Sequence, residues 1–213
     1  MKTTRITIVT ILLFGAIWGG LEALVSGTID GLSAPVPRSV ILAAIAVLVL
    51  AMARFLAPGR GSTLAIGLVA MAVKAVSLPS LWNCQLAAVI GQALICDIAF
   101  SIAENRRLTE RLAAMIPVMI ATSYVNSLLF SFSQAYLFQN SWWLDRGPAG
   151  LLAWSFGTGS LAALASGVGF AGGMLLAARI KTGFESLVTR HGVAYQVGSL
   201  ALALCVFVAV GLA

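Results

Sequence analysis

Three ionisable side chains lie inside apolar stretches of this sequence, where a charge is costly. They are Glu22 in IWGGLEAL, Lys74 in AMAVKAVSL and Asp97 in ALICDIAF. Charged groups in such surroundings are expected to pair with one another, to contact a ligand or to carry protons. Each of the three is therefore a candidate functional residue, and its role depends on the elements that position it.

Those elements are expected to be membrane-spanning helices. Of the 213 residues, 60% are hydrophobic and 9% are charged, against about 25% charged residues in a typical soluble domain. A helix that crosses a bilayer needs about 20 mostly apolar residues, and backbone hydrogen bonding in lipid favours helices. The sequence predicts an all-α polytopic membrane bundle of six to seven helices in a single domain, 1–213, with helices near 6–27, 39–57, 62–78, 84–103, 112–138, 151–178 and 193–212.

The basic residues predict how this bundle is oriented. With a cytoplasmic N-terminus, the outer loops contain Arg38 and Arg146, whereas the inner loops contain Lys2, Arg5, Arg54, Arg60, Arg106, Arg107, Arg111, Arg179, Lys181 and Arg190. This asymmetry follows the positive-inside rule, so the net charge of +6 requires no nucleic-acid partner. We expect a multi-pass protein of the plasma or inner membrane, in contact with lipid. The first apolar run also resembles a signal peptide, whose cleavage would leave six helices.

Glu22 and Lys74 are expected at the same depth, near the outer boundary. Each lies a few residues from the outer end of its helix, which at about 1.5 Å per residue is roughly 6–8 Å below that boundary. An ion pair between them would either hold the first helix against the third or belong to a polar pocket open to the outside. The candidate substrate-binding residues at this level are Trp18, Glu22, Lys74, Asn83, Gln85 and Gln92.

A stripe of polar residues marks the predicted helix 112–138. Its members are Ser123, Ser127, Ser131 and Gln134, with Tyr124 and Asn126 alongside. Such a stripe either faces a cavity or packs against another helix. The tryptophans of the following segment, Trp142 and Trp143, are typical of an interfacial aromatic belt, and a lid over the pocket is the alternative.

Asp97 lies nearer the inner end of its helix, where Arg106 or Arg107 is an expected partner. A structural or topological role is therefore expected for it. His191 is the single histidine, and Cys84, Cys96 and Cys205 lack the spacing of metal ligands, so no metal and no cofactor are predicted. The sequence contains no ATP-hydrolysis motif and no nucleophile–base arrangement, so an enzyme is not expected.

Small residues form two stripes that would allow close contact between helices. The first contains Gly15, Ala16, Gly19 and Gly20, and the second contains Ala165, Gly169, Gly173 and Ala177. They serve either internal packing or the docking of another membrane subunit.

A basic, almost wholly helical chain of 213 residues without an ATPase motif resembles the substrate-binding S components of energy-coupling factor transporters. The resemblance implies a vitamin-like small-molecule ligand near the outer face and a transmembrane coupling subunit with ATPases. In that case Gly15, Ala16, Gly19 and Gly20 would dock on the coupling subunit, and Trp18, Glu22, Lys74 and Asn83 would line the pocket. The predicted seven helices with an outer C-terminus depart from the usual six with both ends inside.

Two other functions remain open from the sequence. A membrane assembly factor or accessory subunit would use the Glu22–Lys74 pair for structure alone. A stand-alone ion- or proton-coupled carrier would instead use Glu22 or Asp97 as its protonated site.

Overall fold

The computed structural model describes residues 2–29, 37–76, 84–105 and 112–212, and within these ranges every regular element is helical. The all-α prediction is therefore confirmed. The elements are α1 (Lys2–Ile29), α2 (Arg38–Leu56), α3 (Ser62–Val76), α4 (Cys84–Asn105), α5 (Leu112–Phe132), the π-helical turn η2 (Ser133–Leu137), α6 (Ser141–Leu144), α7 (Gly147–Phe156), α8 (Thr158–Arg190) and α9 (Gly192–Leu212).

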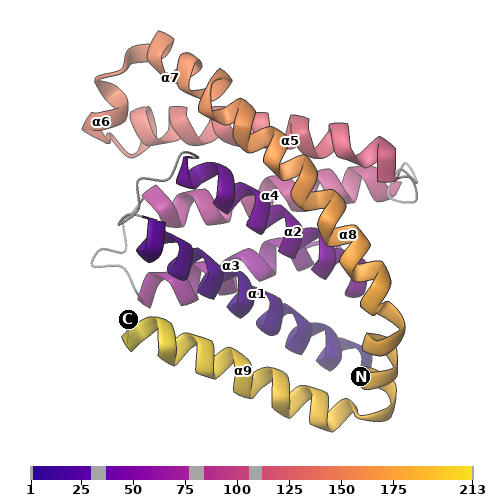
Figure 1. Cartoon of the computed structure of the whole chain (residues 1–213). Coiled ribbons are helices and arrows are strands. Elements are labelled where there is room, and N and C mark those ends of the chain that lie inside the picture. Colours follow the sequence, from indigo (N-terminus) through magenta and orange to yellow (C-terminus); the bar gives the residue numbers. More distant parts are fainter. Residues whose placement is uncertain (1, 30–36, 77–83, 106–111, 213) are drawn as a thin grey trace.

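The helices form a bundle of membrane-crossing segments. In the described part of the chain, six segments are long and apolar enough to cross a membrane: α1, α2, α4, α5 with η2, α7 with α8, and α9. The shorter α3 runs beside α1 and α4 (Figure 1). The chain is therefore a multi-pass integral membrane protein, in agreement with the predicted six to seven helices.

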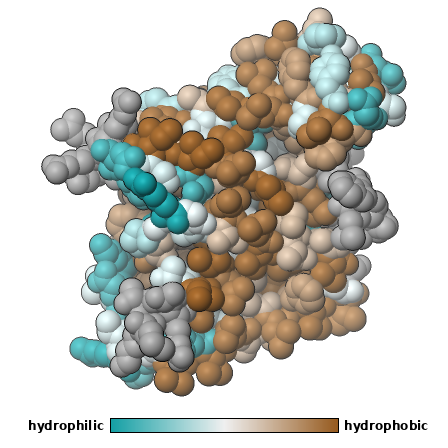
Figure 2. All heavy atoms as spheres, turned by 180° about the vertical axis from the view of Figure 1, so that it is seen from behind, coloured by the Kyte–Doolittle hydropathy of each residue, from teal (hydrophilic) through white to brown (hydrophobic). Residues whose placement is uncertain are grey.

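The bundle has two distinct ends. The N-terminal end holds the start of α1, the turn between α2 and α3, and the turn between α8 and α9 (Figure 1). The far end holds α6, the start of α2 and the end of α9. Figure 2 shows hydrophobic side chains over the middle of one face, with most hydrophilic side chains toward the two ends.

Glycines allow neighbouring helices to approach at backbone distance. A Cβ atom on Gly169 of α8 would lie 2.3 Å from the Ala44 carbonyl oxygen of α2, and one on Gly173 would lie 2.4 Å from that of Leu48. The second predicted stripe of small residues therefore packs α8 against α2.

The first stripe also packs inside the chain, which is the first of the two roles expected for it. A Cβ on Gly15 would lie 2.5 Å from Val69 of α3, and one on Gly20 would lie 2.7 Å from Val206 of α9. Gly19 makes a similar approach to α3, and Ala16 is buried. Hydropathy and spacing identified a close helix contact here, but they could not distinguish an internal neighbour from an external one.

The segment predicted as one helix, 151–178, differs most from expectation. Gly157 breaks it between α7 and α8, with a backbone at φ −89° and ψ −89°. Helix α8 then continues to Arg190, well beyond the apolar residues. The prediction followed hydropathy, whereas the helix continues because its polar extension contains few helix breakers.

Candidate functional site

The predicted partners Glu22 and Lys74 form an ion pair between α1 and α3. The Lys74 Nζ lies 2.6 Å from Glu22 Oε2, and the two residues are 1% and 5% exposed, respectively. The other carboxylate oxygen accepts a hydrogen bond from Trp18 Nε1 at 3.3 Å. Both oxygens of Glu22 are therefore held by donors.

The sequence of α1 explains how this arrangement forms. Trp18 and Glu22 are one helical turn apart and lie on one face of α1. Gly19, between them, lets α3 approach so closely that a Cβ there would lie 2.7 Å from the Ala70 carbonyl oxygen. Lys74 is one turn beyond Ala70, so the close contact places its ammonium group beside the carboxylate.

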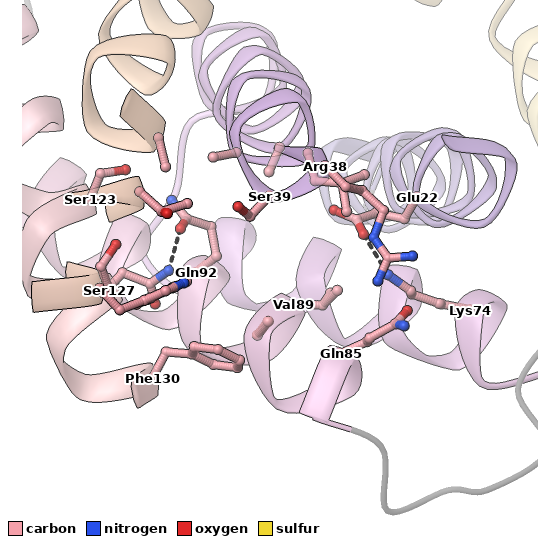
Figure 3. Close-up of a pocket in the computed structure, with 18 of the residues that line it drawn as sticks. Glu22, Arg38, Ser39, Lys74, Gln85, Val89, Gln92, Ser123, Ser127 and Phe130 are labelled. Atoms are coloured by element: carbon pink, nitrogen blue, oxygen red, sulfur yellow. Dashed lines mark hydrogen bonds and ion pairs between the residues drawn. The ribbon is translucent and has the colours of Figure 1, made fainter. Parts of the chain in front are cut away.

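A cavity of about 390 Å³ lies next to the ion pair (Figure 3). Its lining includes residues of α6 and of the start of α2, which lie at the far end of the bundle. Five of the six predicted binding residues line it: Trp18, Glu22, Lys74, Gln85 and Gln92. The sixth, Asn83, lies outside the described residues. Pockets for small ligands in proteins are typically about 300–1,000 Å³, so this cavity is of the size that a small organic molecule requires.

The cavity residues that were missed as site candidates include Arg38 and Ser39, at the start of α2. Arg38 was assigned to an outer loop, but it is the first residue of α2. The preceding Pro37 was the available signal, because proline is common just before or at the start of a helix. The structure thus adds a second cation to the end of the cavity that contains the ion pair.

The opposite side of the cavity carries amide and hydroxyl groups. Asn126 Nδ2 donates to Gln92 Oε1 at 2.6 Å, and Gln92 Nε2 in turn contacts Cys96 Sγ at 3.3 Å. Ser123 and Ser127 of the predicted stripe also line the cavity. The stripe therefore faces the cavity over its first half.

The second half of the stripe packs between helices instead. Ser131 Oγ lies 3.1 Å from Ser155 Oγ of α7, and Gln134 is buried in η2. Beside the stripe, Tyr124 donates to Ser160 Oγ at 2.6 Å. Both predicted roles of these polar residues, cavity lining and helix packing, thus occur along one helix.

Aromatic side chains line another part of the cavity wall. They come from α5, α6 and α7 and are Phe130, Trp142, Trp143 and Trp154. Trp143 stands edge-on to Trp142 and Trp154, with ring centroids 4.7 and 4.8 Å apart, and it is buried. Trp142 is 54% exposed, and the Arg146 guanidinium lies 3.8 Å from its ring centroid. The pair thus borders the cavity, as the lid interpretation requires, and Trp142 also faces outward.

A second buried ionic cluster lies at the N-terminal end of the bundle. Arg54 is 4% exposed, and its Nε and Nη2 donate to the two carboxylate oxygens of Glu104 at 2.7 and 2.8 Å. Its Nη1 lies 3.2 Å from Asp97 Oδ1. The predicted partners Arg106 and Arg107 lie outside the described residues, and within those residues Asp97 pairs with Arg54.

This second cluster fastens the turn between α2 and α3 to α4. The Asp97 carboxylate accepts hydrogen bonds from the backbone N–H groups of Gly61 and Thr63, at 3.0 and 3.2 Å. Arg54 also donates to the carbonyl oxygen of Gly59. Asp97 therefore holds the start of α3, in line with the structural role predicted for it.

The groups that line the cavity are ones that could bind a small solute. Polar groups that can hold and orient a solute converge on it, and aromatic rings border it. Within the described residues, no three His, Cys, Asp or Glu side chains are grouped to hold a metal ion.

A comparison of this chain with family models, with curated proteins and with solved structures finds no match in any of the three.

Proposed function

We propose that the protein binds a small organic solute in the far-end cavity and acts as the substrate-binding subunit of a multi-subunit membrane transporter. The observation that carries this proposal is the cavity itself. Five polar or charged side chains line it: Glu22, Arg38, Lys74, Gln92 and Asn126. Burying such groups around a cavity costs stability, and a bound solute provides a reason for keeping them.

The competing functions fit the contacts less well. In a proton-coupled carrier, Glu22 or Asp97 would release its partners at each protonation, yet both carboxylates are held by several donors. In a purely structural accessory subunit, the ion pair would need no cavity of about 390 Å³ beside it. A layout like that of energy-coupling factor S components supports the transporter.

In this proposal a transmembrane coupling subunit with ATPases supplies the energy. It would contact a surface other than the stripe of Gly15, Ala16, Gly19 and Gly20, because α3 and α9 cover that stripe. The vitamin-like character of the solute rests on the resemblance alone.

The proposed solute should copurify with the protein. We expect native mass spectrometry of the protein in mild detergent to detect one bound small molecule. An Ala88→Leu substitution, which adds a branched side chain at the cavity wall, should abolish its retention. Ala87→Leu is the matched control, because Ala87 is the preceding residue of α4 and does not line the cavity. If Ala88→Leu and Ala87→Leu retain the small molecule equally, the molecule binds outside the cavity and the proposal loses its basis.

We also propose that the N-terminal end faces the cytoplasm, which opens the cavity to the outside. The basic residues described at that end include Arg54 in the last turn of α2, Arg60 in the turn that follows it and Arg190 in the last turn of α8. Their position accords with the positive-inside rule. A membrane-impermeant thiol reagent applied to intact cells should label Ser141→Cys in α6 and not His191→Cys in the α8–α9 turn. Cys84 and Cys205 would first be replaced by serine. Labelling of His191→Cys alone would invert this orientation.

A further inference from the structure

The two sides of the cavity differ in chemistry, and that difference restricts the class of solute. Figure 3 shows Arg38, Glu22 and Lys74 together on one side, with Ser123 and Ser127 on the other. The aromatic side chains of α5, α6 and α7 form a third part of the wall. A solute that fills the cavity therefore meets a charged group, hydrogen-bonding groups and aromatic rings at once.

The charged side favours an anion. Among the described lining residues it contains two cations, Arg38 and Lys74, and one carboxylate, Glu22. That carboxylate already binds the Lys74 ammonium and the Trp18 indole, so a cationic solute would have to compete with Lys74 and would also meet Arg38. A guanidinium has five N–H donors, so Arg38 can hold a carboxylate in addition to a protein neighbour.

The position of Arg38 strengthens this preference. It and Ser39 are the first two residues of α2, and both line the cavity. The start of a helix carries a partial positive charge from its aligned peptide dipoles, which stabilises a nearby anion. Within the described part of the chain, no side chain caps the start of α2. The helix end therefore adds to the field of the two cationic side chains.

The aromatic wall favours a flat, apolar body for the solute. Phe130 lies edge-on to Trp143 with centroids 5.5 Å apart, and Trp154 stands perpendicular to Trp143. Rings held at right angles present both faces and edges, and aromatic groups pair well in either geometry. The volume of about 390 Å³ lies in the range of about 300–1,000 Å³ that is typical of pockets for small organic ligands.

We propose that the solute is a small aromatic carboxylate, with its carboxylate between Arg38 and Lys74 and its ring against Phe130, Trp143 and Trp154. This inference rests on the proposed binding function and makes it specific. Gln92 and Asn126, on the amide side of the cavity, would then contact polar substituents of the ring.

The test uses three naphthalene probes of similar size and different charge: 2-naphthoate, 2-naphthamide and 2-naphthylmethylamine. Binding to the protein in nanodiscs is measured by equilibrium dialysis, with empty nanodiscs subtracted. We expect the anion to bind about ten- to hundredfold more tightly than the amide or the amine, as hydrogen bonds to charged groups imply. Arg38→Gln should remove most of this preference and leave the affinity for the amide almost unchanged.

Two further variants keep the result interpretable. Arg38→Lys retains the positive charge and should retain the preference for the anion. Arg179→Gln removes an exposed arginine of α8 that does not line the cavity, and it should leave all three affinities unchanged. A thermal unfolding midpoint measured for each variant checks that it is folded.

The outcomes separate this inference from the proposed function. If the amide or the amine binds as tightly as the anion, the cavity is a binding site but the carboxylate assignment is wrong. If none of the three probes binds, the aromatic carboxylate is also excluded, and the proposed function is then decided by the copurifying molecule. An equal loss of anion affinity in Arg179→Gln would show that the preference arises at the membrane surface and would overturn the inference.

Discussion

Arg54→Met is expected to destabilise the protein by about 3 kcal/mol. Breaking a buried ion pair by removing one partner costs about 3–5 kcal/mol, because the remaining charge stays buried and unpaired. Here two carboxylates, Asp97 and Glu104, lose their guanidinium partner. We expect the lower end of that range because Glu104 is 33% exposed and water screens its charge. Unfolding in SDS-containing mixed micelles measures the change.

Arg60→Met provides a matched control on the same turn between α2 and α3. Arg60 is exposed and donates to Asn105 of α4 at 2.6 Å, so its replacement should change the free energy of unfolding by about 0.5 kcal/mol or less. If both variants lose the same stability, the turn itself is sensitive to substitution and the buried cluster has no special role. Because the cluster lies at the opposite end from the cavity, Arg54→Met should still retain the solute wherever it remains folded.

The sequence predicted the Glu22–Lys74 pair because depth in a membrane follows from counting. A helix rises by a fixed distance per residue, so two charges that lie equally far from the same membrane boundary in two parallel spans reach the same level. The same count placed Gln85 and Gln92 near them. Sequence alone, however, gives no lateral neighbours, and it could not tell that α3 lies against α1 on the face that contains Gly15 and Gly19.

Because the sequence does not tell which helices are adjacent, it did not predict the contacts of two arginines. Arg54 and Asp97 were both placed near the inner boundary, but Arg54 was counted as a loop charge that fixes topology, although it is buried against α4. Arg38 was likewise counted as an outer-loop charge. The positive-inside rule counts the basic residues on each side of the membrane. It does not tell which of their side chains are buried between helices.

For Trp142 and Trp143 the sequence left two interpretations open, an interfacial belt and a lid over the pocket. Trp143 becomes buried because α6 and α7 fold back beside α5, where Phe130 meets it. The Asn140 side chain caps α6 by accepting a hydrogen bond from the Trp142 backbone. Gly147, with φ +61°, allows the chain to turn into α7. These local turns determine whether a tryptophan faces lipid or a cavity, and hydropathy does not distinguish the two positions.

Removing both charges of the Glu22–Lys74 pair should separate stability from binding. Glu22→Gln and Lys74→Met alone should each cost about 3–5 kcal/mol, because each leaves one buried charge without its partner. The double variant Glu22→Gln/Lys74→Met leaves no such charge and should recover most of that stability. It should nevertheless lose the copurifying solute, because the charged side of the cavity no longer has its ammonium group.

The control for this double variant is a buried contact of α1 that lies away from the cavity. Thr10 and Tyr195 share a hydrogen bond of 2.8 Å between α1 and α9, and neither lines the cavity. Tyr195→Phe should therefore lower stability by about 1 kcal/mol and leave solute retention in native mass spectra unchanged. A stable Glu22→Gln/Lys74→Met protein that still retains its solute would show that the pair only joins α1 to α3. The proposed role of Lys74 in binding would then have to be abandoned, because its ammonium group would be dispensable in the cavity it lines.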